Sequence, residues 1–169
     1  ARKQGLLATF MAKPFGNVPG SGMHLHCSLV DKTGINVFRS ESLAANDLLL
    51  NAVAGCLSTL KDCMLLFAPN LNSYRRFQLE SHAPLTQSWG YDNRTSAIRI
   101  PAGDSDSRRI EHRVSGADVN PYLVVSALLA GIFKGINEQI EPPADTVGNA
   151  YDQLEMSLPR YWSDALRIF

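Results

Sequence analysis

Polar and apolar residues alternate strictly along residues 23–29, which predicts a half-buried β-strand. One face carries apolar or thiol side chains: Met23, Leu25, Cys27 and Leu29. The other face carries polar side chains: His24, His26 and Ser28. A second strand-like run occupies residues 6–13, and a loop at 15–22 with three glycines and a proline joins the two runs. We therefore expect the two strands to form an antiparallel pair.

Apolar residues at helical spacing mark two longer segments. Between residues 49 and 67 they recur every three or four positions, which predicts an amphipathic helix. Asn120 and Pro121 are residue types preferred at a helix start, and residues 123–136 are apolar nearly all round, which predicts a buried helix. A last helix is expected within residues 158–169.

Two short strand-like runs, 94–100 and 108–114, flank a turn-rich segment and predict a β-hairpin. Residues 70–91 before them are polar and aromatic without a clear period, which is long for a connection. Such a segment is either disordered or functional. Together the strands and helices predict an α+β fold in which an antiparallel sheet is backed by helices.

The composition is that of one globular domain. The 169 residues are 45% hydrophobic and 19% charged, with a formal net charge of zero, which excludes a disordered tail and removes the electrostatic basis for nucleic-acid binding. The most apolar stretch, 122–133, is shorter than the roughly 20 residues that cross a bilayer, so we expect no membrane partner. Three cysteines without metal-ligand spacing favour reduced thiols in a cytoplasmic protein: Cys27, Cys56 and Cys63.

Arginine is concentrated in one part of the chain. Seven of the eleven arginines and none of the lysines lie within residues 75–113. The planar guanidinium binds carboxylate and phosphate groups with two parallel hydrogen bonds, which a lysine ammonium cannot do. Arg109, Glu111 and Arg113 share one face of the second hairpin strand. They form either a cross-strand ion-pair ladder or a site in which Glu111 binds a metal and the arginines hold phosphate oxygens.

Two histidines on the first strand are the other chemical signal. His24 and His26 leave the same face and can reach a shared ligand, although a polar, solvent-facing strand edge explains them equally well. The Gly20-Ser21-Gly22 segment just before them favours a site, because glycine permits close backbone approach to a bound group. Motifs of serine hydrolases, P-loop proteins and zincins are absent from the sequence.

Together, five spaced motifs resemble the C-terminal catalytic domain of glutamine synthetase. They occur in order at residues 20–28, 72–76, 93–101, 108–113 and 120–123, with the sequences GSGMHLHCS, NSYRR, NRTSAIRIP, RRIEHR and NPYL. The resemblance extends from about residue 10 to residue 136. It implies that ATP phosphorylates the γ-carboxylate of glutamate and that an amine then displaces the phosphate. The sheet is then expected to be part of a partial barrel.

The resemblance also implies a role for each matching residue. His24 and Glu111 are similar to ligands of Mg²⁺ or Mn²⁺. The residues similar to those around ATP are His26, Ser28, Arg94, Arg109 and Arg113. The residues similar to those around glutamate are Gly20, Arg76 and Arg99. Three of the positions are expected to act in catalysis: Arg76, Arg94 and His82.

Two positions depart from the ammonia-using members of that family. His82 stands where those members carry a flap glutamate that helps bind and deprotonate ammonium, and Pro19 stands where many have asparagine. With residues 89–92, these changes resemble the γ-glutamyl-polyamine branch, in which the acceptor is a larger amine; ammonia remains the other acceptor. Residues 149–152 resemble the tyrosine loop that some bacterial members adenylylate.

The resemblance also indicates what residues 1–169 leave out. The family's other metal-binding glutamates and its small N-terminal β-domain would lie upstream, and the chain begins without methionine and stops inside a helical pattern. We therefore expect a fragment, inactive alone, of an enzyme that assembles into homo-oligomeric rings. A non-catalytic structural relative is the alternative of a different class.

Overall fold

The fold is built on a four-stranded mixed sheet that does not close into a barrel. A computed structural model describes residues 1–41, 44–153 and 155–169. The strands are β1 (Leu25–Cys27), β2 (Trp89–Tyr91), β3 (Ile98–Ile100) and β4 (Ile110–His112), in the spatial order β1-β4-β3-β2. β4 lies antiparallel to both β1 and β3, whereas β2 and β3 are parallel. The prediction of a wholly antiparallel sheet is therefore wrong for one of its three pairings.

The parallel pairing requires the short link between β2 and β3 to bring the chain back to the level at which β2 begins. Asp92 adopts a left-handed φ of 48°, and the Asn93 side chain accepts hydrogen bonds from the backbone N–H and the hydroxyl of Thr95. The amide of Asn93 also donates to the carbonyls of Thr146 and Gly148. These contacts fix the link between β2 and β3 against residues 146–148. The chain therefore runs along β3 in the same direction as along β2.

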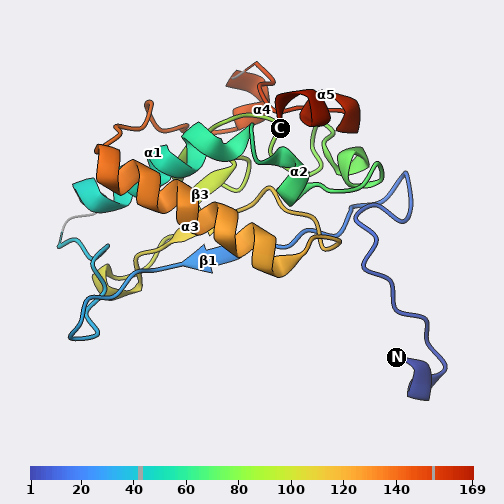
Figure 1. Cartoon of the computed structure of the whole chain (residues 1–169), viewed down its shortest axis with the longest axis horizontal. Helices are drawn as coiled ribbons and strands as arrows, with labels where there is room; N and C mark the ends of the chain where they lie inside the picture. Colours follow the sequence, from blue (N-terminus) through green and yellow to red (C-terminus); the bar gives the residue numbers. More distant parts are fainter. Residues whose placement is uncertain (42–43, 154) are drawn as a thin grey trace.

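The alternation at residues 23–29 is confirmed, but the expected partner strand is not. Residues 6–13 form no strand; a short 3₁₀ helix η1 (Arg2–Gln4) is followed by extended chain with exposed Leu7 and Phe10. In Figure 1 the N-terminal end projects away from the rest of the molecule, whereas Ala12 and Lys13 are buried. The antiparallel partner of β1 is β4, because the apolar face of β1 packs on the core only when it is paired there.

Two long helices pack against each other beside the sheet. They are α1 (Asp47–Leu60) and α3 (Pro121–Glu138), seen side by side in Figure 1. Each starts at an asparagine whose side chain accepts a backbone N–H: Asn46 from Leu49, and Asn120 from Tyr122 and Leu123. The predicted start of α3 is confirmed. The helix expected over 49–67 is instead divided, with α2 (Met64–Phe67) following a turn.

Glycines set the distance between α1 and α3. A Cβ built on Gly55 would lie 2.1 Å from the carbonyl oxygen of Gly131, and one on Gly135 would lie 2.0 Å from that of Asn51. The backbones therefore touch at a spacing that no larger residue permits.

The composition of α3 predicted burial on all sides, but the structure buries only one side of this helix. The side facing α1 is buried, whereas the opposite side exposes large apolar side chains to solvent: Tyr122, Leu123, Val125, Leu129 and Phe133. Among the described residues only one side of this helix has a packing partner, so half of its apolar surface stays uncovered.

Residues 70–91 are folded, so the disordered alternative for this segment is wrong. They include the 3₁₀ helix η2 (Ser73–Arg76), in which Tyr74 and Arg76 are buried. Two short helices, α4 (Ala150–Gln153) and α5 (Trp162–Ile168), and the 3₁₀ helix η3 (Ser105–Ser107) complete the described elements. None of the helices described is both long and apolar enough to span a membrane.

Candidate functional site

The strand register places three charged or ionisable residues in one row across the sheet. Glu111 on β4 lies opposite His26 on β1 and opposite Arg99 on β3. Since side chains two residues apart share a face, His24 and Arg113 join the same face one step along. The residues predicted from two distant segments therefore meet.

Glu111 is the centre of this cluster. Its Oε2 accepts a hydrogen bond from Nη1 of Arg99 at 2.7 Å, and its Oε1 accepts one from Nη1 of Arg113 at 2.7 Å. Nδ1 of His24 is 3.2 Å from the same Oε1. Glu111 is 3% exposed and Arg113 is 4% exposed, so the carboxylate and one of its two arginines are withdrawn from water.

The electrostatics follow from this geometry. Burial alone would raise the pKa of Glu111, but the hydrogen bond from Arg99 and the charges of Arg113 and Arg99 outweigh it and hold the pKa below its usual range. Burial and the charge of Arg113 lower the pKa of His24, against the opposing effect of Glu111. Near neutral pH the cluster thus combines an ionised carboxylate, two guanidinium groups and a neutral imidazole.

The ion-pair ladder and the ligand site considered for this strand are both consistent with the contacts. Arg109 lies on the same face as Glu111, but its Nε donates to Nδ1 of His26 at 3.0 Å and its Nη1 donates to the carbonyl of Ser107. Arg99 also pairs with Asp92 on the reversal after β2. Glu111 is shared by two guanidinium groups, which leaves the face with more positive than negative charge for an anion to neutralise.

A second part of the site surrounds Arg76. This side chain is 5% exposed, and its Nη1 donates to the carbonyl of Val114 at 3.0 Å. A Cβ on Gly20 would lie 2.8 Å from Cγ of Arg76, and one on Gly22 would lie 3.1 Å from its Nη2. Both glycines thus pack against Arg76, and at Gly20 a Cβ would also lie 2.7 Å from the backbone oxygen of Ala12, so a larger residue does not fit there.

A small cavity joins the two parts. Its volume is about 210 Å³, and its lining combines Arg76 and His24 with Gly20, Gly22 and the exposed His82. His82 adopts a left-handed φ of 59°, which costs a non-glycine residue about 1 kcal/mol or more. The chain therefore holds an imidazole at this rim in a conformation that it does not ordinarily favour.

The side chain of Arg94 lies away from the cluster, whereas Ser28 lies on the predicted face. The exposed side chain of Arg94 lines a different cavity with Asn93 and Thr146, and what joins Arg94 to the cluster is its backbone carbonyl, which accepts from Nη2 of Arg113 at 3.0 Å. Ser28 lies just past β1 on the exposed face that carries His24 and His26.

Sequence reasoning missed two carboxylates, Asp92 beside Arg99 and Asp118 beside Arg76. Both lie in loops, where no period assigns a face, so no signal in the local sequence identifies them.

The residues present do not make a complete Mg²⁺ or Mn²⁺ site. Magnesium requires near-octahedral oxygen coordination, whereas His24 and Glu111 supply one imidazole and one carboxylate, and both Glu111 oxygens already accept hydrogen bonds from arginines. Among the described residues no group of three His, Cys, Asp or Glu side chains is arranged to hold a metal ion. Any such site needs ligands beyond those described.

Weak metal binding is therefore expected for this chain alone. Titration calorimetry with MgCl₂ or MnCl₂ should show no saturating heat below millimolar metal, because two ligands cannot replace the hydration shell of the ion. A micromolar dissociation constant that disappears in Glu111→Gln would contradict this expectation.

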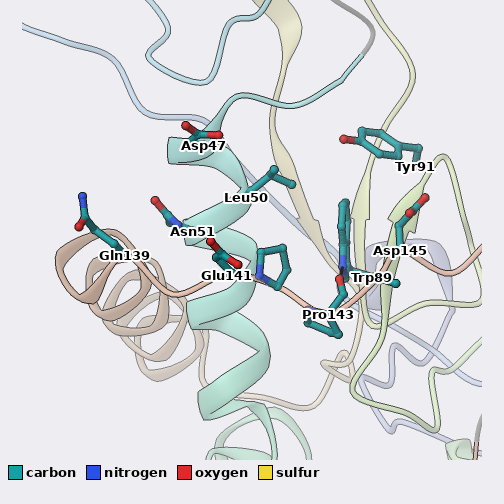
Figure 2. Close-up of a pocket in the computed structure, with 11 residues that line it drawn as sticks. Asp47, Leu50, Asn51, Trp89, Tyr91, Gln139, Glu141, Pro143 and Asp145 are labelled. Carbon is teal, nitrogen blue, oxygen red and sulfur yellow. Dashed lines mark hydrogen bonds between the residues drawn. The ribbon is translucent and has the colours of Figure 1, made fainter.

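A larger cavity of about 690 Å³ lies elsewhere, between α1, β2 and residues 139–145. Figure 2 shows Trp89, Tyr91 and Asp145 on one side of it and Asn51 and Glu141 on the other. Its lining contains none of the residues predicted for the site.

Comparison with known proteins agrees with the motifs. The family model "Glutamine synthetase, catalytic domain" matches residues 1–169. The chain is 44% identical over 169 residues to gamma-glutamylputrescine synthetase PuuA of Escherichia coli, covering 100% of this chain and 36% of that protein. It is 43% identical over 151 residues to a gamma-glutamylethanolamide synthetase of Streptomyces coelicolor, covering 89% of this chain and 32% of the relative.

A solved structure agrees as well. A GmaS/ADP complex superposes with a TM-score of 0.86 at 30% identity, covering 99% of this chain and 40% of that one. The chain thus spans about a third of the length of the curated relatives it matches. Motifs, fold and family match together show that the chain belongs to the glutamine synthetase family, as part of its catalytic domain.

Proposed function

We propose that these residues are the C-terminal part of the catalytic domain of a longer, ATP-dependent ligase that joins the γ-carboxylate of glutamate to an alkylamine. The observation that carries the proposal is the buried Glu111 carboxylate between Arg99 and Arg113 with His24 beside it. Such a face, with a surplus of guanidinium groups, suits an anion that changes its charge during a reaction.

The reaction has two steps. In the first, an oxygen of the γ-carboxylate attacks the terminal phosphorus of ATP; the bond to the β,γ-bridging oxygen breaks, leaving ADP and γ-glutamyl phosphate. In the second, the free-base amine attacks the acyl carbon and inorganic phosphate departs. The protonated amine loses one proton before it attacks, and its nitrogen loses a second proton when the tetrahedral intermediate expels phosphate. The phosphate and solvent take up these two protons.

The arginines and the histidines are assigned to different parts of this chemistry. We assign the ATP phosphates to Arg94, Arg109 and Arg113, with His26 and Ser28 near the nucleotide. Glutamate is assigned to Gly20, Arg76 and Arg99. His24 and Glu111 would contribute to a metal site that needs further ligands from outside these residues. Guanidinium groups near the transferring phosphoryl group offset the charge that spreads over its oxygens.

The acceptor is proposed to be an alkylamine rather than ammonia. His82 lines the cavity beside Arg76 and His24, where ammonia-using members carry an acid. An imidazole binds an ammonium ion less well than a carboxylate does. Two relatives are named for γ-glutamyl products of putrescine and ethanolamine, which supports the same branch. Ammonia is the alternative acceptor.

A non-catalytic relative is the alternative of another class. It is disfavoured by the guanidinium groups themselves, because Arg76 and Arg113 are buried and burying unneeded charge is costly. We further propose a cytoplasmic, homo-oligomeric protein, in which the open sheet forms part of a partial barrel completed by other segments.

The test is an acceptor comparison with the full-length protein. ATP, Mg²⁺ and glutamate are supplied with putrescine, ethanolamine, isopropylamine or ammonium, and both phosphate release and the amide product are measured. We expect kcat/KM for at least one alkylamine to exceed that for ammonium by about 100-fold or more, the scale on which contacts to a substrate's polar and apolar groups discriminate. A preference for ammonium would contradict the proposed acceptor, and no phosphate release with any amine would contradict the ligase function.

A further inference from the structure

Asp118 is joined to the segment that carries Arg76. It lies in the connection between β4 and α3, and its Oδ2 accepts hydrogen bonds from the hydroxyl of Ser73 at 2.7 Å and from the amide of Asn70 at 3.0 Å. Ser73 is the first residue of η2 and Arg76 is the last. The carboxylate is thus fixed to the same turn that presents the guanidinium.

The second oxygen of this carboxylate is buried without a hydrogen-bond partner. Oδ1 of Asp118 is shielded from solvent and accepts no hydrogen bond. A Cβ built on Gly116 would lie 2.5 Å from this Oδ1 and 3.3 Å from Nη1 of Arg76. The carboxylate and the guanidinium therefore face each other across a space that one methyl group would fill.

The charges on the two sides of this space complement each other. Burial lowers the pKa of Arg76, and the charge of Asp118 acts in the opposite direction. A buried guanidinium without a counter-charge is costly, and a buried carboxylate oxygen without a donor is also costly. The charge of Asp118 therefore offsets part of the cost of burying Arg76.

We propose that Asp118 is a positioning residue for Arg76: its carboxylate holds the guanidinium against the Val114 carbonyl, and Gly116 keeps the space between them open. Nη1 donates to the Val114 carbonyl and lies within the field of the Asp118 charge, while Arg76 also lines the small cavity. The inference rests on the proposed function only in naming glutamate as the anion bound there.

The first test removes the charge and keeps the shape. In the full-length protein, Asp118→Asn is expected to raise the KM for glutamate about 10-fold and to leave the KM for ATP within 2-fold, because only the glutamate arginine loses its orientation. Gly116→Ala should produce the same selective defect, since its Cβ displaces Oδ1. Asp118→Glu, which keeps the charge, should fall between wild type and Asp118→Asn.

Matched controls separate positioning from stability. Asp106→Asn, at an exposed acid in η3, should leave both KM values unchanged. A merely structural Asp118 would lower the unfolding midpoint while leaving the glutamate KM of the folded enzyme intact, and that result would overturn the proposal.

A second readout does not need activity. Phenylglyoxal labelling of Arg76, followed by mass spectrometry of the peptide, should proceed several-fold faster in Asp118→Asn than in wild type, because the guanidinium is less constrained. An unchanged rate overturns the role of Asp118. If the wild type ligates no amine, the proposed function fails, and the labelling rate still decides the role of Asp118.

Discussion

Replacement of Glu111 by glutamine is expected to lower the free energy of unfolding by about 3 to 5 kcal/mol. The carboxylate is the shared partner of Arg99 and Arg113, and Arg113 and Glu111 are both almost fully buried. A neutral amide leaves these guanidinium groups close together without their common counter-charge. In the full-length enzyme, phosphate release should also fall by about 1,000-fold or more, the upper range for loss of one preorganised polar group.

Urea unfolding followed by circular dichroism measures the first effect, and phosphate release at saturating substrates measures the second. Glu111→Asp keeps the charge and should lose less stability than Glu111→Gln. Glu155→Gln, at an exposed position, is the matched control and should change neither quantity. An unfolding free energy within 1 kcal/mol of wild type in Glu111→Gln would show that the arginines do not depend on this carboxylate.

Substitution of Gly55 by alanine should destabilise the fold by about 3 kcal/mol, although alanine favours helix by about 1 kcal/mol over glycine. The new Cβ would lie 2.1 Å from the carbonyl of Gly131 and 2.5 Å from the backbone nitrogen of Gly135. Neither atom belongs to a flexible side chain, so α1 and α3 must separate. The packing between two whole helices is then lost around the contact.

The matched control is Gly16→Ala, because a Cβ at that position meets nothing within 4 Å. Thermal unfolding should show a lower midpoint for Gly55→Ala and an unchanged one for Gly16→Ala. Gly55→Ala with wild-type stability would mean that the helices can move apart without cost, contrary to the close packing described here.

Signals that depend on neighbouring residues predicted the local structure well. The alternation around β1, the hairpin of β3 and β4 and the asparagine start of α3 are all readable because period and capping are local properties. Packing between distant segments determines three other features: the parallel position of β2, the missing strand at 6–13 and the exposed side of α3. No short sequence window contains that information.

In the candidate site, too, local patterns predicted some residues and distant contacts determined the others. Alternation placed Arg109, Glu111 and Arg113 on one face, and the antiparallel pairing of β1 with β4 brought His24 and His26 to it. Asp92 pairs with Arg99 from a loop, and Asp118 acts on Arg76 through its charge from another loop. The side chain of Arg94 lines a different cavity, although its motif suggested otherwise. Loop conformations follow from tertiary contacts rather than from a repeat.

The row formed by His26, Glu111 and Arg99 also protects the fold against mispairing. Side chains alternate between the two sides of a strand, so a slip of β4 by one residue would turn Glu111 toward the apolar core and expose His112, which is now fully enclosed. Such a slip would bury the Glu111 carboxylate among apolar side chains and separate it from both Arg99 and Arg113. The residues assigned to catalysis therefore also specify the register of β4, because registers shifted by one residue bury an unpaired charge and are less stable.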